Sequence, residues 1–185
     1  MMAHASGKTG PFFKMGFMGT LSGLIISPVR WFSEAFPRTT SKEAGGMLLL
    51  SSLFYAAAGA LPLSGTGALV RAAILMVNAL GMTVLCAAIA WLVGAIGNGS
   101  RIRFSSIWRV FAIGTIPTLL IAWVPSSFFF TEPWKWVLVA LGMIYGLGMG
   151  KGRTVWVLMI TASLTAVLFL AILRLMVASP TPPAF

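Results

Sequence analysis

Residues 72–96 read AAILMVNALGMTVLCAAIAWLVGAI, a run without a single charged side chain. A helix needs about 20 apolar residues to cross roughly 30 Å of membrane hydrocarbon, and this run exceeds that length. The whole chain has the same character, because 58% of its residues are hydrophobic and 9% are charged. A soluble domain carries about 25% charged residues to cover its surface. The sequence therefore predicts an all-α integral membrane protein.

Four further apolar runs have a similar length. The third and fourth of the five runs are separated by little more than FFFTEPWK, which predicts a tight helical hairpin. Residues 178–185, which end in SPTPPAF, form a short external tail after the last run. We expect a membrane domain over residues 44–177 with five transmembrane helices, at residues 44–63, 72–96, 107–128, 134–150 and 155–177.

Residues 1–26 form a polar tail followed by the weakly apolar segment FMGTLSGLII. Lys8 and Lys14 lie ahead of this segment, as basic residues do in a signal peptide, but no small-residue cleavage site follows before Arg30. We therefore expect the segment to be retained as part of a cytoplasmic N-terminal region.

The basic residues predict the orientation. Ten precede the first span or lie in the second and fourth connections, and three (Arg71, Lys135 and Arg174) lie on the opposite side. Because cytoplasmic loops carry an excess of Lys and Arg, we expect a cytoplasmic N-terminus and an external C-terminus in a bacterial inner membrane. Arg109 is expected to extend to the cytoplasmic surface. Charges clustered in short connections argue against nucleic-acid binding. The ten are Lys8, Lys14, Arg30, Arg38, Lys42, Arg101, Arg103, Arg109, Lys151 and Arg153.

The stretch SPVRWFSEAFPR is predicted to form an amphipathic helix over residues 27–37. Ser27 suits the N-cap and Pro28 the first helical position. The aromatic residues fall on one face and the polar residues on the other, which is typical of a helix lying in the headgroup region. Such a helix could orient the first span, dock a partner or act as a lid. The candidate contacts with lipid or a protein partner are Arg30, Trp31, Phe32, Phe36 and Arg38.

The residues used by most enzymes are scarce. The chain has no Asp, one histidine (His4, in the polar tail) and one cysteine (Cys86). Its acidic residues are Glu34, Glu43 and Glu132, all outside the predicted spans. An active site needs titratable groups in a shielded place. We therefore predict a non-enzymatic protein without catalytic residues, metal or cofactor.

Five residues within the predicted spans are candidates for helix packing or for a path through the membrane. Asn78 is expected either to hydrogen-bond a neighbouring helix or to line a polar path. Pro117 is expected to kink the third span, either as fixed packing or as a hinge. Gly142, Gly146 and Gly150 are spaced by four, which lets another helix approach closely. The partner of this face could belong to the same chain or to another copy.

The order of these parts resembles the Yip family of Ypt/Rab-interacting membrane proteins, in particular its bacterial members. The resemblance covers roughly residues 24–172. It rests on LIISPVRWFSEAF before the first span, on the proline-bearing IGTIPTLL, and on the close pair WVLVALGMIYGLGMGKGRTVWVLMITASLTAVLFLAI. The family implies five spans and a cytosolic N-terminus, as the sequence itself predicts.

We thus expect a Yip-like scaffold or adaptor that contacts a protein partner or anionic lipid at the cytoplasmic face. Two alternatives remain open. One is a small transporter or channel component, in which a homo-oligomer could form through the glycine face. The other is an accessory subunit of a larger membrane complex.

Overall fold

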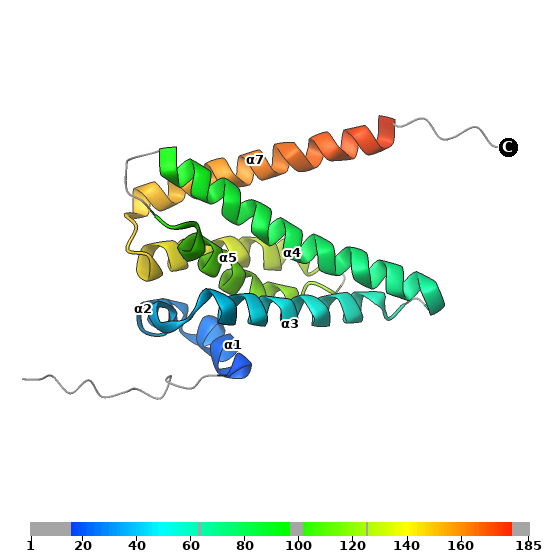
Figure 1. Cartoon of the computed structure of the whole chain (residues 1–185), viewed down its shortest axis with the longest axis horizontal. Helices are drawn as coiled ribbons and strands as arrows, with labels where there is room; N and C mark the ends of the chain where they lie inside the picture. The colour runs from blue at the N-terminus through cyan, green and yellow to red at the C-terminus, as the bar shows by residue number, and fades with distance from the viewer. Residues whose placement is uncertain (1–15, 63, 97–101, 125, 179–185) are drawn as a thin grey trace, which may run out of the picture.

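The computed structural model describes residues 16–62, 64–96, 102–124 and 126–178. Residues 1–15 of the predicted cytoplasmic N-terminal region and residues 179–185 of the predicted external tail lie outside this part. The described residues form helices and no strand, and the five largest helices run alternately back and forth along the long axis (Figure 1). The predicted all-α fold is confirmed. These helices are α3 (Ser41–Ala60), α4 (Gly65–Ile96), α5 (Phe104–Leu119), α6 (Phe128–Leu141) and α7 (Lys151–Ala178).

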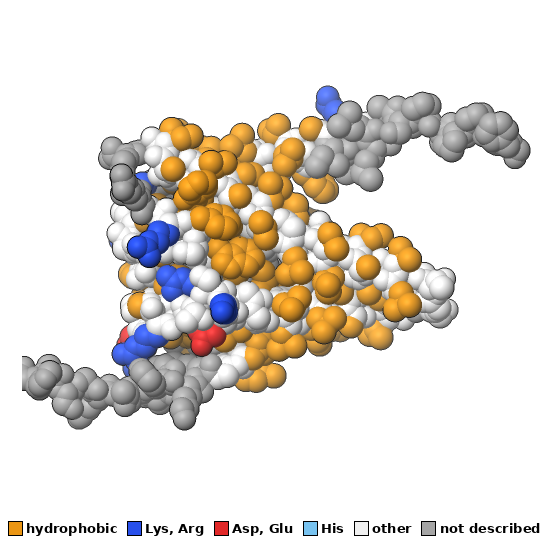
Figure 2. All heavy atoms as spheres, viewed as in Figure 1, with side chains coloured by type: hydrophobic (Ala, Val, Ile, Leu, Met, Phe, Trp, Pro, Cys, Tyr) orange, Lys and Arg blue, Asp and Glu red, His pale blue; other side chains and the backbone are white. Residues whose placement is uncertain are grey.

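Two of these helices are long and apolar enough to cross a membrane. They are α4 and the segment Lys151–Ala171 of α7. Within their most apolar stretches, 33% and 22% of the residues are buried, so most of each stretch lies at the surface of the protein. Figure 2 shows large apolar side chains over the outer surfaces of α3, α4 and α7. The fold therefore presents an apolar outer surface of the kind that suits contact with lipid.

Helix α5 occupies the centre of the bundle. Eleven of its 16 residues are buried, and it packs against α3, α4 and α6. Gly114 permits a close approach of α6, because a Cβ there would lie 2.9 Å from Cγ2 of Val139 on that helix. A central helix enclosed by its neighbours explains why its sequence contains no lipid-facing stripe.

Helix α3 begins three residues before the predicted first span. Thr40 and Glu43 form a capping box, in which the Thr40 backbone N–H donates to the Glu43 carboxylate at 2.7 Å. The Glu43 N–H donates in return to the Thr40 hydroxyl at 3.2 Å. These bonds satisfy two donors that a helix start leaves without intrahelical partners. The segment TTSKEA between the predicted amphipathic helix and the first predicted span is therefore mostly helical.

The predicted hairpin between the third and fourth spans differs from the structure. Helix α5 ends two residues after Pro117, whose ring removes a backbone donor, so Pro117 stands in a final turn and not at a mid-span kink. The chain then reverses direction between the end of α5 and the start of α6. FFFTEPWK, read as the link, instead forms the first two turns of α6. Helices α4 and α7 also begin earlier than predicted, at Gly65 and Lys151.

Before α3 the chain folds into three short helices. The weakly apolar segment, predicted only as part of a tail, forms α1 (Phe17–Ile26). Helix α2 (Pro28–Glu34) starts with Pro28 as predicted, although the Ser27 side chain makes no capping bond. A 3₁₀ turn, η2 (Phe36–Arg38), leads to α3, and a π turn, η3 (Gly142–Gly146), extends α6. These elements position the two regions described next.

Candidate functional site

The aromatic face of α2 is buried inside the protein. Trp31, Phe32 and Phe36 are 3%, 0% and 1% exposed. Their rings contact one another in series: Trp31 and Phe32 meet edge to face with centroids 5.3 Å apart, and Phe32 and Phe36 meet at a tilt with centroids 5.8 Å apart. The prediction that these three residues contact lipid or a protein partner is wrong for this fold, because they pack against the chain's own helices.

The partner of this aromatic face is the predicted glycine face. A Cβ on Gly142 would lie 2.8 Å from Cε1 of Phe32, and a Cβ on Gly146 would lie 2.7 Å from Cδ1 of Phe36. Both glycines belong to η3, where the Leu147 N–H donates to the Gly142 carbonyl in the wide π pattern. The glycine face is thus filled from within the same chain. Gly150 takes no part, since nothing lies within 4 Å of its Cβ position.

Arg109 fastens this junction. Its guanidinium donates to the Thr39 carbonyl and lies 4.9 Å from the centre of the Phe36 ring. The predicted extension of the Arg109 side chain to the cytoplasmic surface is not observed. The side chain instead connects α5 to the segment between η2 and α3. Of the predicted contact residues, Arg30 and Arg38 lie at the surface, and Arg30 pairs with Glu34 at 3.0 Å.

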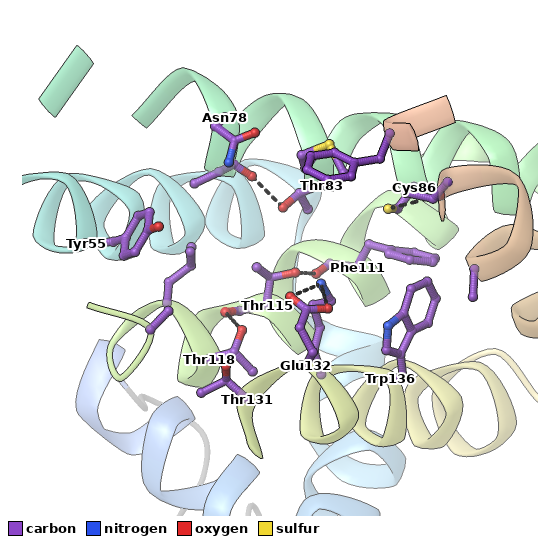
Figure 3. Close-up of a pocket in the computed structure, with 18 of the residues that line it drawn as sticks. Tyr55, Asn78, Thr83, Cys86, Phe111, Thr115, Thr118, Thr131, Glu132 and Trp136 are labelled. Atoms are coloured by element: carbon purple, nitrogen blue, oxygen red, sulfur yellow. Dashed lines mark hydrogen bonds and ion pairs between the residues drawn. The ribbon is translucent and has the colours of Figure 1, made fainter. Parts of the chain in front are cut away.

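A second region contrasts with this packed junction. A cavity of about 520 Å³ lies among α4, α5, α6 and α7, with Tyr55 of α3 at its margin (Figure 3). It lies towards the end of the bundle where α5 finishes and α6 begins. Figure 2 shows that most of the Lys and Arg side chains in this view gather at the opposite end. Cavities of roughly 300–1,000 Å³ are typical of small-molecule sites.

An ion pair stands in the wall of this cavity. Lys135 Nζ lies 2.6 Å from Glu132 Oε2 and 2.8 Å from Oε1, one turn apart on α6. The side chains are 19% and 35% exposed, so they are partly withdrawn from the surface. The Lys135 ammonium also lies 5.6 Å from the centre of the Trp136 ring. In Figure 3 the Glu132 carboxylate reaches towards Thr115 of α5.

Hydroxyl groups from α4 and α5 line the same cavity as the ion pair. The Thr83 hydroxyl donates to the Ala79 carbonyl at 2.8 Å, and the Thr115 hydroxyl donates to the Phe111 carbonyl at 2.8 Å. Thr118 donates to the Thr115 carbonyl at 2.7 Å. Because each proton is used within its own helix, what these oxygens can still offer is a lone pair. The threonines therefore act as acceptors towards the cavity.

Asn78 and Cys86 line the same cavity from α4. The Asn78 side chain is exposed to it and makes no hydrogen bond with another side chain or backbone group among the described residues. Asn78 therefore lies in the cavity wall, and its two predicted roles, a helix-to-helix hydrogen bond or the lining of a polar path, stay predictions. Cys86 is 6% exposed, and its sulfur lies 3.7 Å from the Thr165 hydroxyl of α7. Pro117 stands between two cavity threonines but does not itself line the space.

Glu132 and Lys135 are not among the predicted site residues, because the sequence FFFTEPWK predicts a link between two spans. The available signal was the spacing of three between opposite charges, with Thr131 beside them, which suits one helical face. Among the described residues, no group of three His, Cys, Asp or Glu side chains is arranged to hold a metal ion. No family model matches this chain, and neither a curated protein nor a solved structure is significantly similar to it.

Proposed function

We propose that the chain crosses a bacterial inner membrane five times, through α3 to α7, with its N-terminal side in the cytoplasm. The alternating course of these helices and the basic end of the bundle support this topology. At about 1.5 Å per residue, the 16-residue α5 rises only about 24 Å. A short helix is compatible with a span here, because irregular backbone at membrane depth is tolerated where protein encloses it or where it lines a cavity.

Aromatic side chains support the same placement. Trp123, Phe129, Phe130 and Trp134 are exposed around the start of α6, and Trp and Tyr gather at membrane interfaces. This aromatic band lies at the end of the bundle away from the basic cluster, where the outer interface is expected.

The function that the geometry supports best is the binding or passage of a small polar molecule within the membrane, as in a small transporter or channel component. The observation that carries this proposal is the cavity with its Glu132–Lys135 pair. The pair lies on the first turns of α6, beside the aromatic band at the proposed outer interface, and its position in the cavity wall makes both charges available to a ligand that enters from that side. The cavity is about 520 Å³, large enough for an amino-acid-sized solute.

The scaffold hypothesis receives less support, because the aromatic surface that was to dock a partner is buried. Membership of the Yip family and a role as an accessory subunit remain proposals that rest on the sequence. Phe32 and Phe36 occupy the face of Gly142 and Gly146, so this face is not available for contact with a second copy of the chain. Contact of Arg30 and Arg38 with anionic lipid stays compatible with their surface positions.

The single cysteine of the chain tests the proposal, because Cys86 lies in the cavity wall. We expect the membrane-impermeant reagent MTSET, added to sealed right-side-out vesicles, to modify Cys86. The same reagent on inside-out vesicles should modify it more slowly, since the cavity lies away from the basic end. Cys86→Ser is the blank. A Cys86 that stays unmodified from both sides in the folded protein would refute a solute-accessible cavity.

A further inference from the structure

The cavity carries no net charge but contains one charge of each sign. Glu132 and Lys135 are the two charged side chains in its wall. A ligand with a net charge would leave one of them, or itself, uncompensated in a poorly solvated place, which is unfavourable. A ligand that bears both signs can instead pair with each partner in turn. On this basis we infer that the cavity binds a small zwitterion, with its cationic group at Glu132 and its anionic group at Lys135. The inference rests on the proposed function.

The acceptor groups favour the same arrangement. Thr115 and Thr118 line the same cavity as the Glu132 carboxylate, and their hydroxyl protons are already bonded within α5. A primary ammonium has three donors and no acceptor, so it can bond to Glu132 and to threonine oxygens together. The Asn78 amide, which lies across the cavity on α4, offers a further acceptor.

The Lys135 ammonium has a favourable contact besides its ion pair with Glu132. Its ammonium lies 5.6 Å from the Trp136 ring, within the range of a cation–π contact. When the ligand's ammonium takes over the Glu132 carboxylate, Lys135 retains this ring and gains the ligand's anionic group. Ligand binding thus replaces the Glu132–Lys135 ion pair with two ion pairs, one to each residue, and leaves every charge paired.

The remaining wall accepts an apolar group. Phe111 and Trp136 meet edge to face at 6.4 Å between ring centres, and Met82, Leu119 and Phe169 complete the apolar lining. This combination suits a zwitterion that carries an apolar side arm. Two sources share this chemistry. One is a neutral amino acid in solution, and the other is the ethanolamine phosphate headgroup of an outer-leaflet lipid.

The test measures thermal stability of the full chain in a maltoside detergent with matched ligands. L-phenylalanine supplies both charges, 2-phenylethylamine lacks the carboxylate, and 3-phenylpropionate lacks the amine. Short-chain phosphatidylethanolamine represents the lipid source, with short-chain phosphatidylglycerol as its anionic control. We expect a concentration-dependent rise in Tm with L-phenylalanine or with the ethanolamine lipid, and no rise with the single-charge compounds. Which of the two zwitterions acts identifies the source.

Two variants make the result specific. Glu132→Gln and Lys135→Met should each weaken the apparent affinity by about tenfold or more, because each removes a charge-assisted bond. Val137→Met, on the exposed side of α6, should leave it unchanged. If either cavity variant fails to fold, the ligand series on the unaltered chain still decides the question.

Each outcome is informative. Equal stabilisation by 2-phenylethylamine would overturn the zwitterion assignment in favour of a cation site. If none of the compounds acts although MTSET modifies Cys86, the ligand class is wrong while the proposed function stands. An unmodified Cys86 would overturn both.

Discussion

The two ends of this bundle solve the problem of interior space in opposite ways. At the basic end, the rings of Phe32 and Phe36 enter the places left by Gly142 and Gly146, so the junction of α2 and η3 is filled. At the other end, short hydroxyl side chains and Asn78 line a cavity of about 520 Å³. Large rings packed against glycines fill the space between the helices at the basic end, whereas the short polar side chains around the cavity leave such a space open.

The difference teaches where function is expected. A filled apolar contact contributes stability through burial and dispersion. A polar cavity forgoes those contacts and keeps groups available for a ligand. We therefore assign stability to the α2–η3 junction and ligand binding to the cavity, and the following substitutions test that division.

The largest effect is expected from Phe32→Ala. Phe32 is fully buried, so truncation should cost about 3–5 kcal/mol through lost burial and an empty space. The measurement is the shift in Tm of the detergent-solubilised protein. Phe130→Ala is the matched control, since Phe130 is 80% exposed and should change Tm little. Equal shifts for the two variants would refute the packed junction.

Gly146→Leu attacks the same junction from the opposite side. The new side chain would begin 2.7 Å from the Phe36 ring and should destabilise the fold by about 1–3 kcal/mol through overpacking. Gly150→Leu adds the same atoms where nothing lies within 4 Å. A Tm that falls equally in both variants would show that the position, and not the fit to Phe36, matters.

Thr40→Ala tests a polar support of the basic end and should cost about 1 kcal/mol by removing the N-cap. Hydrogen bonds from Thr40 hold the pKa of Glu43 below its ordinary value near 4.5. A carboxyl with a lowered pKa stabilises the fold above its unfolded pKa, and this contribution is lost as the pH falls through the folded value. Stability should therefore fall below about pH 4.5, and less steeply in Thr40→Ala. The backbone N–H of Thr40, which is the larger cause of the lowered pKa, remains in both variants, so part of the pH dependence should persist in Thr40→Ala and all of it in Thr40→Ser. A Tm at neutral pH that is unchanged in Thr40→Ala would contradict the capping box.

The smallest change in stability is expected from Asn78→Leu. The Asn78 amide makes no hydrogen bond within the described protein, so its loss should alter stability by about 0.5 kcal/mol or less. The same variant should slow the reaction of Cys86 with MTSET, because an apolar group replaces a polar one in the wall. Val77→Leu, next to it on the exposed side, should leave the reaction rate unchanged. A large loss of Tm in Asn78→Leu would return Asn78 to a structural role.

Much of the fold follows from the sequence. Charge-free runs predict that the chain is helical, and the alternation of α2 is correct in period, since Trp31, Phe32 and Phe36 do share one buried face. What periodicity cannot tell is whether that face meets lipid or protein, because both are apolar. The answer lay in Gly142 and Gly146, which are far away in the sequence and offered space of the right size.

The cavity was harder to predict. Its charged residues, Glu132 and Lys135, stand on either side of Pro133 in the sequence. This combination of charges and a proline suggests a loop more strongly than a helix. The threonines of α4 and α5 give no local signal either, because a hydroxyl bonded to its own helix is common in apolar helices. Only the packing of α4, α5, α6 and α7 brings these groups together.

The most direct test of the account compares two neighbours on α4 in a Cys86→Ser background. Thr83 lines the cavity and is 5% exposed, whereas Val84 faces outward and is 44% exposed. In intact vesicles, MTSET from the outside should modify Thr83→Cys faster than Val84→Cys, because solute fills the cavity and lipid covers the outer face. Faster reaction at position 84, or none at either, would contradict the claim that this chain encloses a path for a polar solute.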